Sequence, residues 1–281
     1  MSFEFDHLIH YVREPNEAIR LLRQTGLHAV EGGRHEQRGT YNALCYFDLS
    51  YIELIGVFDK QLADRNRTPH SLLHTIANAS YAEGFVRLAI RTNRIEEDAE
   101  RYAKQGFEVI GPVQGHRKRP DGSSVRWQQL YLAHPDQRFP LPFLIQWEEN
   151  DEERRHDLAK RNVISPHPSG IVELSYVALA VLDFQTAADW SRWFGLALGD
   201  VVTDESIQAV PDAEAARRES EVLQAGRRRN RIRRAGGTRG RPVYGRFIGR
   251  LEARGSASSR RTLPIQHIRR TKKSIQMQGE R

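Results

Sequence analysis

The chain contains very little cysteine and no long hydrophobic run. Among its 281 residues Cys45 is the only cysteine, so no disulfide can form within one chain. No stretch approaches the roughly 20 apolar residues that a membrane-spanning helix needs. The N-terminus also lacks the basic and apolar segments of a secretion signal. These absences predict a globular, cytoplasmic protein without a membrane anchor. Cys45 has no basic neighbours in "ALCYFDL", which favours a core residue over a nucleophile.

Acidic residues are scarce at the C-terminal end. Residues 201–281 hold 20 Lys and Arg against 8 Asp and Glu, a net charge of +12, whereas residues 1–200 carry −5. This end also lacks a sustained apolar period, so we expect residues 211–281 to form a basic, disordered tail. Such a tail could contact nucleic acid non-specifically. It has few aromatic residues for base stacking. We favour the interpretation that the third repeat is truncated where the tail begins, and that the tail has no evolved role.

A strand, a helix and a glycine recur in that order three times. The helical stripes end at Gly26, Gly106 and Gly195, where glycine can adopt the left-handed conformation that releases the chain from a helix. Three extended segments follow each of the first two helices, so each of these repeats is βαβββ. One helix leaves a face of a four-stranded sheet uncovered. The sequence therefore predicts an α+β fold in which two modules combine into a cup-shaped mixed sheet with outer helices.

The boundaries follow from the same pattern. We expect βαβββ modules at residues 1–60 and 83–150, a connector at 61–82, a charged linker at 151–170, a partial third module at 171–210 and the tail at 211–281.

Several motifs of this chain resemble one protein superfamily. "FDHLIHYV" at the first strand and "YIELIG" at the fourth are similar to the vicinal oxygen chelate superfamily. "RKRPDG", "VRWQQLYL", "LPFLIQW" and "HPSGIVELSYVALAV" resemble its glyoxalase-like domain group, much of which lacks an assigned reaction. The resemblance covers about residues 3–200. It is specific for the fold and says little about the chemistry.

The resemblance implies metal ligands on the first and last strand of each repeat, aimed into the cup. In the first repeat these positions carry His7 and Glu53, which can both bind a cation. The offset of 80 residues from Gly26 to Gly106 places Arg87 at the position of His7 in the second repeat, and Gln146 lies near the carboxylate position. In the third repeat Tyr176 takes the His7 position. Arginine stays protonated and cannot bind a metal.

Two functions remain open at this stage. In the first, His7 and Glu53 hold Zn, Mn, Ni or Fe, Glu53 is catalytic, and Arg87, Gln146 and Tyr176 bind the substrate. The reaction is then that of an isomerase or lyase on a small oxygen-chelating molecule. A dioxygenase fits less well, because Arg87 replaces a second histidine. In the alternative, Arg87 pairs with Glu53 and the cup binds a small anion without metal. The oligomeric state is open.

Two shorter stretches also leave alternatives. His10 lies an odd number of residues from His7, so in a regular strand it faces away from the cup. The basic residues of "HRKRPDGSS", at positions 116–119, either steer an anion over the cup or form a solvated hairpin tip. The Pro, Asp and Gly that follow favour the hairpin.

Overall fold

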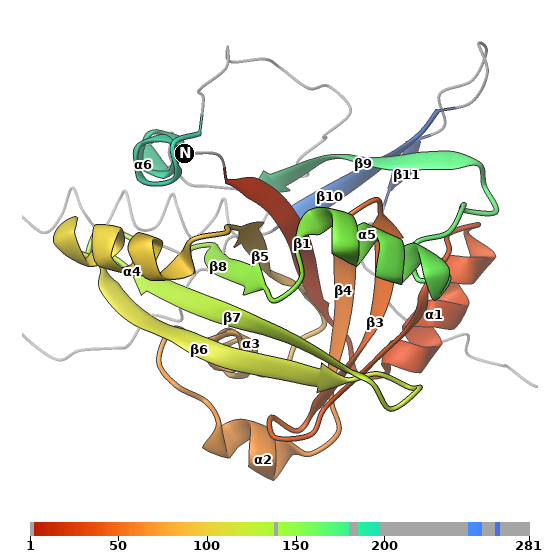
Figure 1. The fold of residues 1–281 in the computed structure, drawn as a ribbon, viewed down its shortest axis with the longest axis horizontal. Coiled ribbons are helices and arrows are strands. Elements are labelled where there is room, and N and C mark those ends of the chain that lie inside the picture. Colours follow the sequence, from red (N-terminus) through yellow and green to blue (C-terminus); the bar gives the residue numbers. More distant parts are fainter. Residues whose placement is uncertain (1–2, 138–139, 180–184, 197–246, 255–261, 265–281) are drawn as a thin grey trace, which may run out of the picture. The chain divides into compact units, whose positions relative to one another are not determined.

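The strands of both βαβββ modules close into one barrel (Figure 1). The computed structural model describes residues 3–137, 140–179, 185–196, 247–254 and 262–264. The first module contains β1 (Glu4–Tyr11), α1 (Pro15–Gln24), β2 (Val30–His35), β3 (Thr40–Phe47) and β4 (Ser50–Val57). The second contains β5 (Gly84–Arg91), α4 (Ile95–Lys104), β6 (Glu108–Lys118), β7 (Ser124–Ala133) and β8 (Phe143–Trp147). The α+β fold of tandem modules is confirmed, with the cup closed into a ring.

The order of strands around the barrel is β1-β4-β3-β2-β6-β7-β8-β5. Within each module the first and last strands run parallel, β1 with β4 and β5 with β8. The modules meet where β1 pairs antiparallel with β5, and where β2 meets β6 through the pair Arg34 and Lys118. A barrel of this kind has no exposed edge strand, because every strand has two neighbours.

Helix α1 covers the outer face of the first module. It begins with Pro15, whose fixed φ suits the first helical turn. Ala18 and Leu22 lie one turn apart and are buried against Cys45 and the rest of the outer core. The helix ends before Gly26, which has φ of +81°. Burial raises the pKa of the Cys45 thiol to about 12, in agreement with a core role rather than a reactive one.

The connector between the modules contains two short helices, α2 (Lys60–Arg65) and α3 (Leu72–Asn78). We call residues 60–78 the strap. Asp59 caps α2 by accepting from the Leu62 amide, and Ser71 caps α3 by accepting from the His74 amide. Ile76 of α3 is fully buried in the core inside the barrel. The strap therefore covers one part of the barrel interior, which the sequence pattern had left as a plain connector.

The charged linker after β8 forms α5 (Asp151–Lys160). It begins with a capping box, in which Asn150 and Glu153 exchange side-chain and backbone hydrogen bonds. Leu158 is buried in a cluster with Tyr46 and Tyr51 of the barrel. Arg154 is buried as well, although it belongs to a strongly polar helix. This helix therefore covers a second part of the barrel.

The segment predicted to be a partial third module begins with β9 (Ile171–Leu179). Its strand partners come from the segment predicted to be a disordered tail, since β10 (Phe247–Arg254) pairs antiparallel with β9 and with β11 (Thr262–Pro264). Disorder of these two stretches is therefore not confirmed. The sequence pattern did not predict them, because β10 is interrupted by Gly and Arg and β11 has only three residues. The remainder of residues 211–281 lies outside the described residues.

Helix α6 (Gln185–Phe194) follows β9 in the sequence. Most of it belongs to a second compact unit, residues 187–243, of which the structure describes only the first ten. Trp190 and Phe194 contact each other edge to face within the helix.

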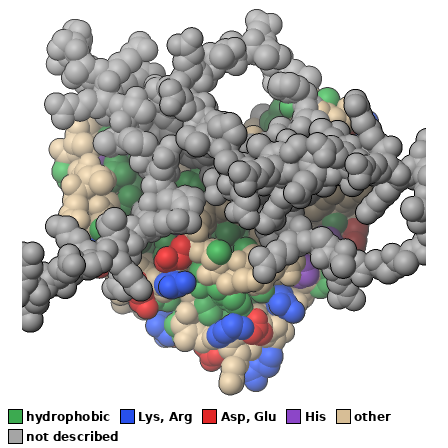
Figure 2. All heavy atoms as spheres, turned by 180° about the vertical axis from the view of Figure 1, so that it is seen from behind, with side chains coloured by type: hydrophobic (Ala, Val, Ile, Leu, Met, Phe, Trp, Pro, Cys, Tyr) green, Lys and Arg blue, Asp and Glu red, His purple; other side chains and the backbone are tan. Residues whose placement is uncertain are grey.

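Charges of both signs are mixed on the described surface. Figure 2 shows acidic and basic side chains close together around apolar atoms at the lower end of the rear face. Lys60 and Asp64 on α2 form one such ion pair. Net positive charge is thus concentrated in the sequence beyond residue 200, most of which is not described. No helix among the described residues is long and apolar enough to cross a membrane.

Candidate functional site

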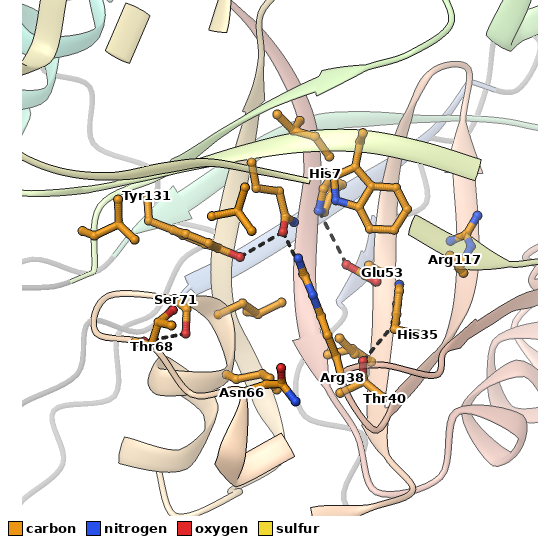
Figure 3. Close-up of a pocket in the computed structure, with 18 of the residues that line it drawn as sticks. His7, His35, Arg38, Thr40, Glu53, Asn66, Thr68, Ser71, Arg117 and Tyr131 are labelled. Carbon is orange, nitrogen blue, oxygen red and sulfur yellow. Dashed lines mark hydrogen bonds and ion pairs between the residues drawn. The ribbon is translucent and has the colours of Figure 1, made fainter. Parts of the chain in front are cut away.

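The barrel encloses a cavity of about 200 Å³ that both modules line. Figure 3 shows His7 and Glu53 facing each other on one side, with Arg38 extending between them and Tyr131. The remaining lining residues come from the strap and from the strands, and both contribute polar and apolar side chains. The cavity is lined by His7, His35, Arg38, Thr40, Tyr51, Glu53, Ile55, Asn66, Thr68, Ser71, Leu72, Leu73, Ile110, Val113, Arg117, Trp127, Gln129, Tyr131, Ile145 and Trp147.

The His7 imidazole is fixed by its neighbour in the sequence. His7 Nδ1 lies 2.6 Å from a carboxylate oxygen of Asp6, and both side chains are buried. The Tyr51 ring stacks on the imidazole at 4.5 Å between centroids. A carboxylate at Nδ1 holds the proton on that nitrogen and directs Nε2 toward the other side of the ring. That side is the cavity.

Asp6 is held by several donors besides His7. Its second oxygen accepts from the Trp147 indole at 3.0 Å and from Arg91 at 3.3 Å, and lies 3.6 Å from Arg154. Burial raises the pKa of Asp6, but the hydrogen bond and charge of His7, the charge of Arg154 and the indole lower it more, to about 2. Asp6 therefore stays ionised, and α5 contributes to this through Arg154.

Glu53 faces His7 across a short gap. The distance from His7 Nε2 to Glu53 Oε2 is 3.6 Å, and the other Glu53 oxygen accepts from the Asn42 amide at 2.5 Å. If His7 is neutral with its proton on Nδ1, two lone-pair acceptors face each other in a buried place. Such an arrangement needs a cation or a shared proton between them.

Three basic side chains form another wall of the cavity. Arg117 is buried, and its Nη1 lies 3.4 Å from the Asn42 carbonyl oxygen. Arg38 donates to the Gln129 carbonyl at 2.8 Å, and the Tyr131 hydroxyl donates to the same oxygen at 3.1 Å. Burial, with the charges of Arg117 and Arg38, lowers the pKa of His35 well below its usual value. His35 is therefore neutral, bonded to Thr40 at 3.0 Å.

Arg87 lies inside the barrel but does not line the cavity. Its Nε donates to the Leu141 carbonyl at 2.7 Å and its Nη1 to the His70 carbonyl of the strap. Burial lowers the pKa of Arg87 to about 10, which still leaves it charged at neutral pH. No ion pair joins it to Glu53 among the described residues, so the expected pair at the cup floor is not formed. Arg87 instead ties the strap to the barrel.

Gln146 also lies away from the cavity lining. The Gln146 carbonyl accepts from the Ile95 amide at 2.8 Å, at the start of α4 on the outer side of the barrel. Its neighbours Ile145 and Trp147 line the cavity, as alternation along β8 requires. Tyr176 belongs to β9, where it is paired with Arg250 of β10. The structure therefore brings His7 and Glu53 together and leaves Arg87 and Gln146 elsewhere, while the side chain of Tyr176 lies outside the described residues.

The strand register explains why the second module lacks a matching pair. Between β1 and β5, His7 pairs with Ala89 and Ile9 pairs with Arg87. An offset of 80 residues relates His7 to Arg87 and Ile9 to Ala89, as the glycine spacing predicted, so the two pairs are equivalent. The parallel pair of Ile9 with Glu53 corresponds to that of Ala89 with Phe143. Phe143 therefore occupies the position in the second module that Glu53 has in the first. The barrel thus has one His and Glu pair at these positions, in the first module.

His7 and Glu53 could supply two ligands of a metal site. No group of three or more His, Cys, Asp and Glu side chains that could hold a metal occurs among the described residues. Two ligands about 2.1 Å from one cation at a tetrahedral angle lie roughly 3.4 Å apart, close to the 3.6 Å between His7 and Glu53. The Asp6 contact to His7 is the usual support of a metal-binding histidine. The pair fits two coordination positions, which water or substrate would complete.

Sequence reasoning missed Asp6, which contacts His7 from outside the cavity lining, and several of the lining residues. The pairing of β1 with β5 has a register irregularity between Phe5 and His7, which regular alternation does not predict. Arg117 was left undecided between solvent and cavity. The alternation of β6 places it inward together with Gly115, while His116 and Lys118 are exposed. The two adjacent glycines of β2, Gly32 and Gly33, were a signal for the inward position of Arg117, because a Cβ at Gly33 would lie 3.2 Å from Cγ of Arg117.

Comparisons with known proteins agree with this architecture. A family model described as a glyoxalase-like domain matches residues 5–194. A hypothetical protein from Staphylococcus aureus is 28% identical, with 73% of this chain and 79% of that chain covered and a TM-score of 0.62. No curated protein matches the chain.

Two enzyme structures are more distant. Methylmalonyl-CoA epimerase from Streptomyces coelicolor is 18% identical over 52% of this chain and 95% of that chain, with a TM-score of 0.38. A mutant of 4-hydroxymandelate synthase from the same organism is 11% identical over 70% of this chain and 54% of that chain, with a TM-score of 0.41. Neither similarity indicates the chemistry of this chain.

Proposed function

Because the chain belongs to the glyoxalase-like domain family, we propose that it is a divalent-metal-assisted isomerase or lyase acting on a small oxygen-chelating substrate. The observation that carries the proposal is the facing of His7 Nε2 and Glu53 Oε2 at 3.6 Å, with Asp6 holding the opposite nitrogen of the imidazole. Zn, Mn, Ni and Fe remain candidates for the metal. Such a cation supplies Lewis-acid stabilisation of the oxyanion or enolate that forms when the substrate loses a proton.

The side chains of the cavity have separate tasks in this proposal. Glu53 is the only carboxylate among the lining residues, so it is the group that can accept a proton from the substrate. The Asn42 amide holds one of its oxygens and leaves the other directed at His7. Asp6 keeps the His7 proton on Nδ1. Trp127 and Ile110 line the walls and keep water away from the proton transfer.

The first prediction concerns the metal content. Protein purified without chelator or nickel affinity should carry bound metal, measured by elemental mass spectrometry. His7→Ala and Glu53→Gln should each lose most of it, because each removes one of two side-chain ligands; outer-shell changes alone cost about 10–100-fold in affinity. Asp6→Asn should weaken retention less than His7→Ala does.

The matched control is His156→Ala, which removes an exposed histidine from α5. It should retain the wild-type metal content, and circular dichroism should show all variants folded. The proposal is contradicted if wild-type protein binds no metal after incubation with Mn²⁺, Zn²⁺, Ni²⁺ or Fe²⁺. Equal metal in wild type and His7→Ala would contradict the site.

A second candidate is a metal-free binding protein for a small anion. It is favoured by Arg117, which makes no ion pair with any described carboxylate. In this case a proton takes the place of the cation, and His7 is an imidazolium between Asp6 and Glu53. The two candidates differ in one measurement, because only the second predicts full ligand affinity in chelator-treated protein.

Two further expectations from the sequence stay proposals. A cytoplasmic location rests on the single cysteine. Non-specific contact of the basic tail with nucleic acid is a distant third function, and it would disappear at high salt and on removal of the tail.

A further inference from the structure

Three arginines are buried in the described part of the chain: Arg87, Arg117 and Arg154. Two of them have partners that account for their burial. Arg87 donates to two backbone carbonyls and lies over the rings of Tyr131 and Phe143, at 5.3 and 5.8 Å. Arg154 Nη1 and Nη2 have no hydrogen-bond partner among the described residues, but Nη1 lies 3.6 Å from an Asp6 carboxylate oxygen and the guanidinium lies 4.2 Å from the centre of the Trp147 ring. Carboxylate, aromatic and carbonyl partners of this kind offset the hydration that a guanidinium loses on burial.

Arg117 has no comparable set of partners. It is 5% exposed, and among the described residues its side chain makes one hydrogen bond, the 3.4 Å contact from Nη1 to the side-chain carbonyl oxygen of Asn42. Its Nε is buried and has no hydrogen-bond partner among the described residues. It makes no ion pair with a described carboxylate, yet it lines the cavity. A buried guanidinium in this condition calls for an anion that comes from outside the chain.

The chain makes room for this arginine with two glycines. A side chain at Gly33 would begin 2.1 Å from the Lys118 carbonyl and 3.2 Å from Cγ of Arg117. A side chain at Gly32 would begin 2.2 Å from the Asn42 carbonyl oxygen, which Arg117 contacts. Gly33 also has φ of +138°, which L-residues rarely adopt. The glycine pair therefore lets β6 approach β2 and lets Asn42 stand between Glu53 and Arg117.

We propose that Arg117 binds a carboxylate group of the substrate, so that the substrate is a small organic acid with a further oxygen function near Glu53. The Asn42 contact occupies one N–H of Nη1. The guanidinium keeps further N–H donors, and its planar fork matches a carboxylate with two parallel hydrogen bonds. Hydroxy acids and oxo acids have this composition.

Asn42 sets the distance between the two halves of the substrate. Its amide nitrogen donates to Glu53 and its carbonyl oxygen faces Arg117. The Asn42 amide thus separates Glu53, which accepts the proton, from the Arg117 guanidinium, which binds the substrate carboxylate. The role of Glu53 rests on the proposed function, but the carboxylate contact at Arg117 needs no metal.

The test is a titration of chelator-treated protein with glycolate, observed by ligand NMR. Wild type should bind glycolate, and Arg117→Gln should weaken binding by about tenfold or more, since a charge-assisted bidentate contact is lost. Arg117→Lys should recover little, because an ammonium lacks the fork. Lys118→Gln is the matched control, since this neighbouring residue is exposed, and should leave affinity unchanged.

A second variant tests the same contact without altering Arg117. Asn42→Asp places a carboxylate beside the guanidinium and, because it replaces the amide donor of Glu53, makes the two carboxyl groups share a proton. The new carboxylate should occupy Arg117 internally and abolish glycolate binding. The thermal transition of this variant should stay cooperative. Equal glycolate affinity in wild type and Arg117→Gln overturns the proposal. A preference of wild type for inorganic phosphate over glycolate also overturns it, and so does the absence of glycolate binding to folded wild type. If wild-type protein binds no metal but still binds glycolate in a way that depends on Arg117, the metal proposal is contradicted and the Arg117 proposal stands.

Discussion

At the scale of single residues, the charge of Asp6 connects stability to the candidate site. Its carboxylate contacts His7, Trp147, Arg91 and Arg154, and it is fully buried. A buried carboxylate with this many donors orients the imidazole and cancels the arginine charge of α5. The residue beside a candidate ligand thus decides which nitrogen of that ligand faces the cavity.

Asp6 also predicts how stability responds to acid. Its pKa is lowered from 3.8 to about 2 in the folded chain, so the unfolded chain takes up the proton first as pH falls. The stabilisation is complete above about pH 5 and is lost as pH falls toward 2, amounting to roughly 2 kcal/mol. Asp6→Asn should lower the free energy of unfolding at pH 7 by about 3–5 kcal/mol, since it leaves Arg154 buried without a carboxylate.

Urea unfolding between pH 2 and pH 7 measures both effects. Asp48→Asn is the control, because Asp48 is exposed and pairs with the exposed Arg155. It should cost less than about 1 kcal/mol. A loss for Asp6→Asn no larger than that of the control would show that the Asp6 cluster does not stabilise the fold.

At the scale of elements, the strap depends on Arg87. This residue is the symmetry mate of His7, and its guanidinium binds the carbonyls of His70 and Leu141. Ser71, Leu72 and Leu73, which line the cavity, directly follow His70. The residue that corresponds to His7 in the second module therefore anchors the segment that covers the cavity.

Removal of this anchor should loosen the strap. Arg87→Met leaves two carbonyls without a charged donor, and we expect a loss of about 2–3 kcal/mol in the free energy of unfolding. Hydrogen exchange of the amides of residues 66–78 should accelerate more than exchange in β3. Arg67→Met, at an exposed position of the strap, is the control. Unchanged exchange in the strap of Arg87→Met would exclude the anchoring role.

At the scale of the whole molecule, the barrel is complete before the basic tail begins. All its strands lie within residues 4–147, and the described strands of the tail pair only with β9 and with each other. β9 itself contributes Val172 to the outer core, next to Leu27 and Phe47. The fold of the first two modules therefore does not depend on pairing with the tail.

Deletion of residues 211–281 tests this independence. The shortened chain should keep a cooperative thermal transition, with Tm lowered by no more than about 8 °C from the loss of the partners of β9. Phe143→Ala in the full chain is the contrasting control, because it empties a fully buried position in the barrel and should cost about 3–5 kcal/mol. Loss of the cooperative transition in the shortened chain would show that the tail is part of the folding unit.

The sequence by itself determined the repeat and the offset between modules, and its resemblance to a known superfamily pointed to His7 and Glu53 as inward residues. The repeat and the offset follow from local periodicity, since glycine stops and strand alternation act over a few residues. Alternation alone could not place Gln146, because a shift of one residue moves a side chain to the other face of the strand. The register of β8 puts Ile145 and Trp147 inside and Gln146 outside.

Only the tertiary structure decided which charges meet. Arg87 and Arg117 both occupy inward positions on strands, but the strap and residue 141 supply carbonyls to the first and nothing comparable to the second. Partners of a buried charge come from segments distant in the sequence, and their geometry depends on closure of the barrel. For that reason the sequence identified the arginine that anchors the strap as the ligand of an anion, and left the better candidate undecided.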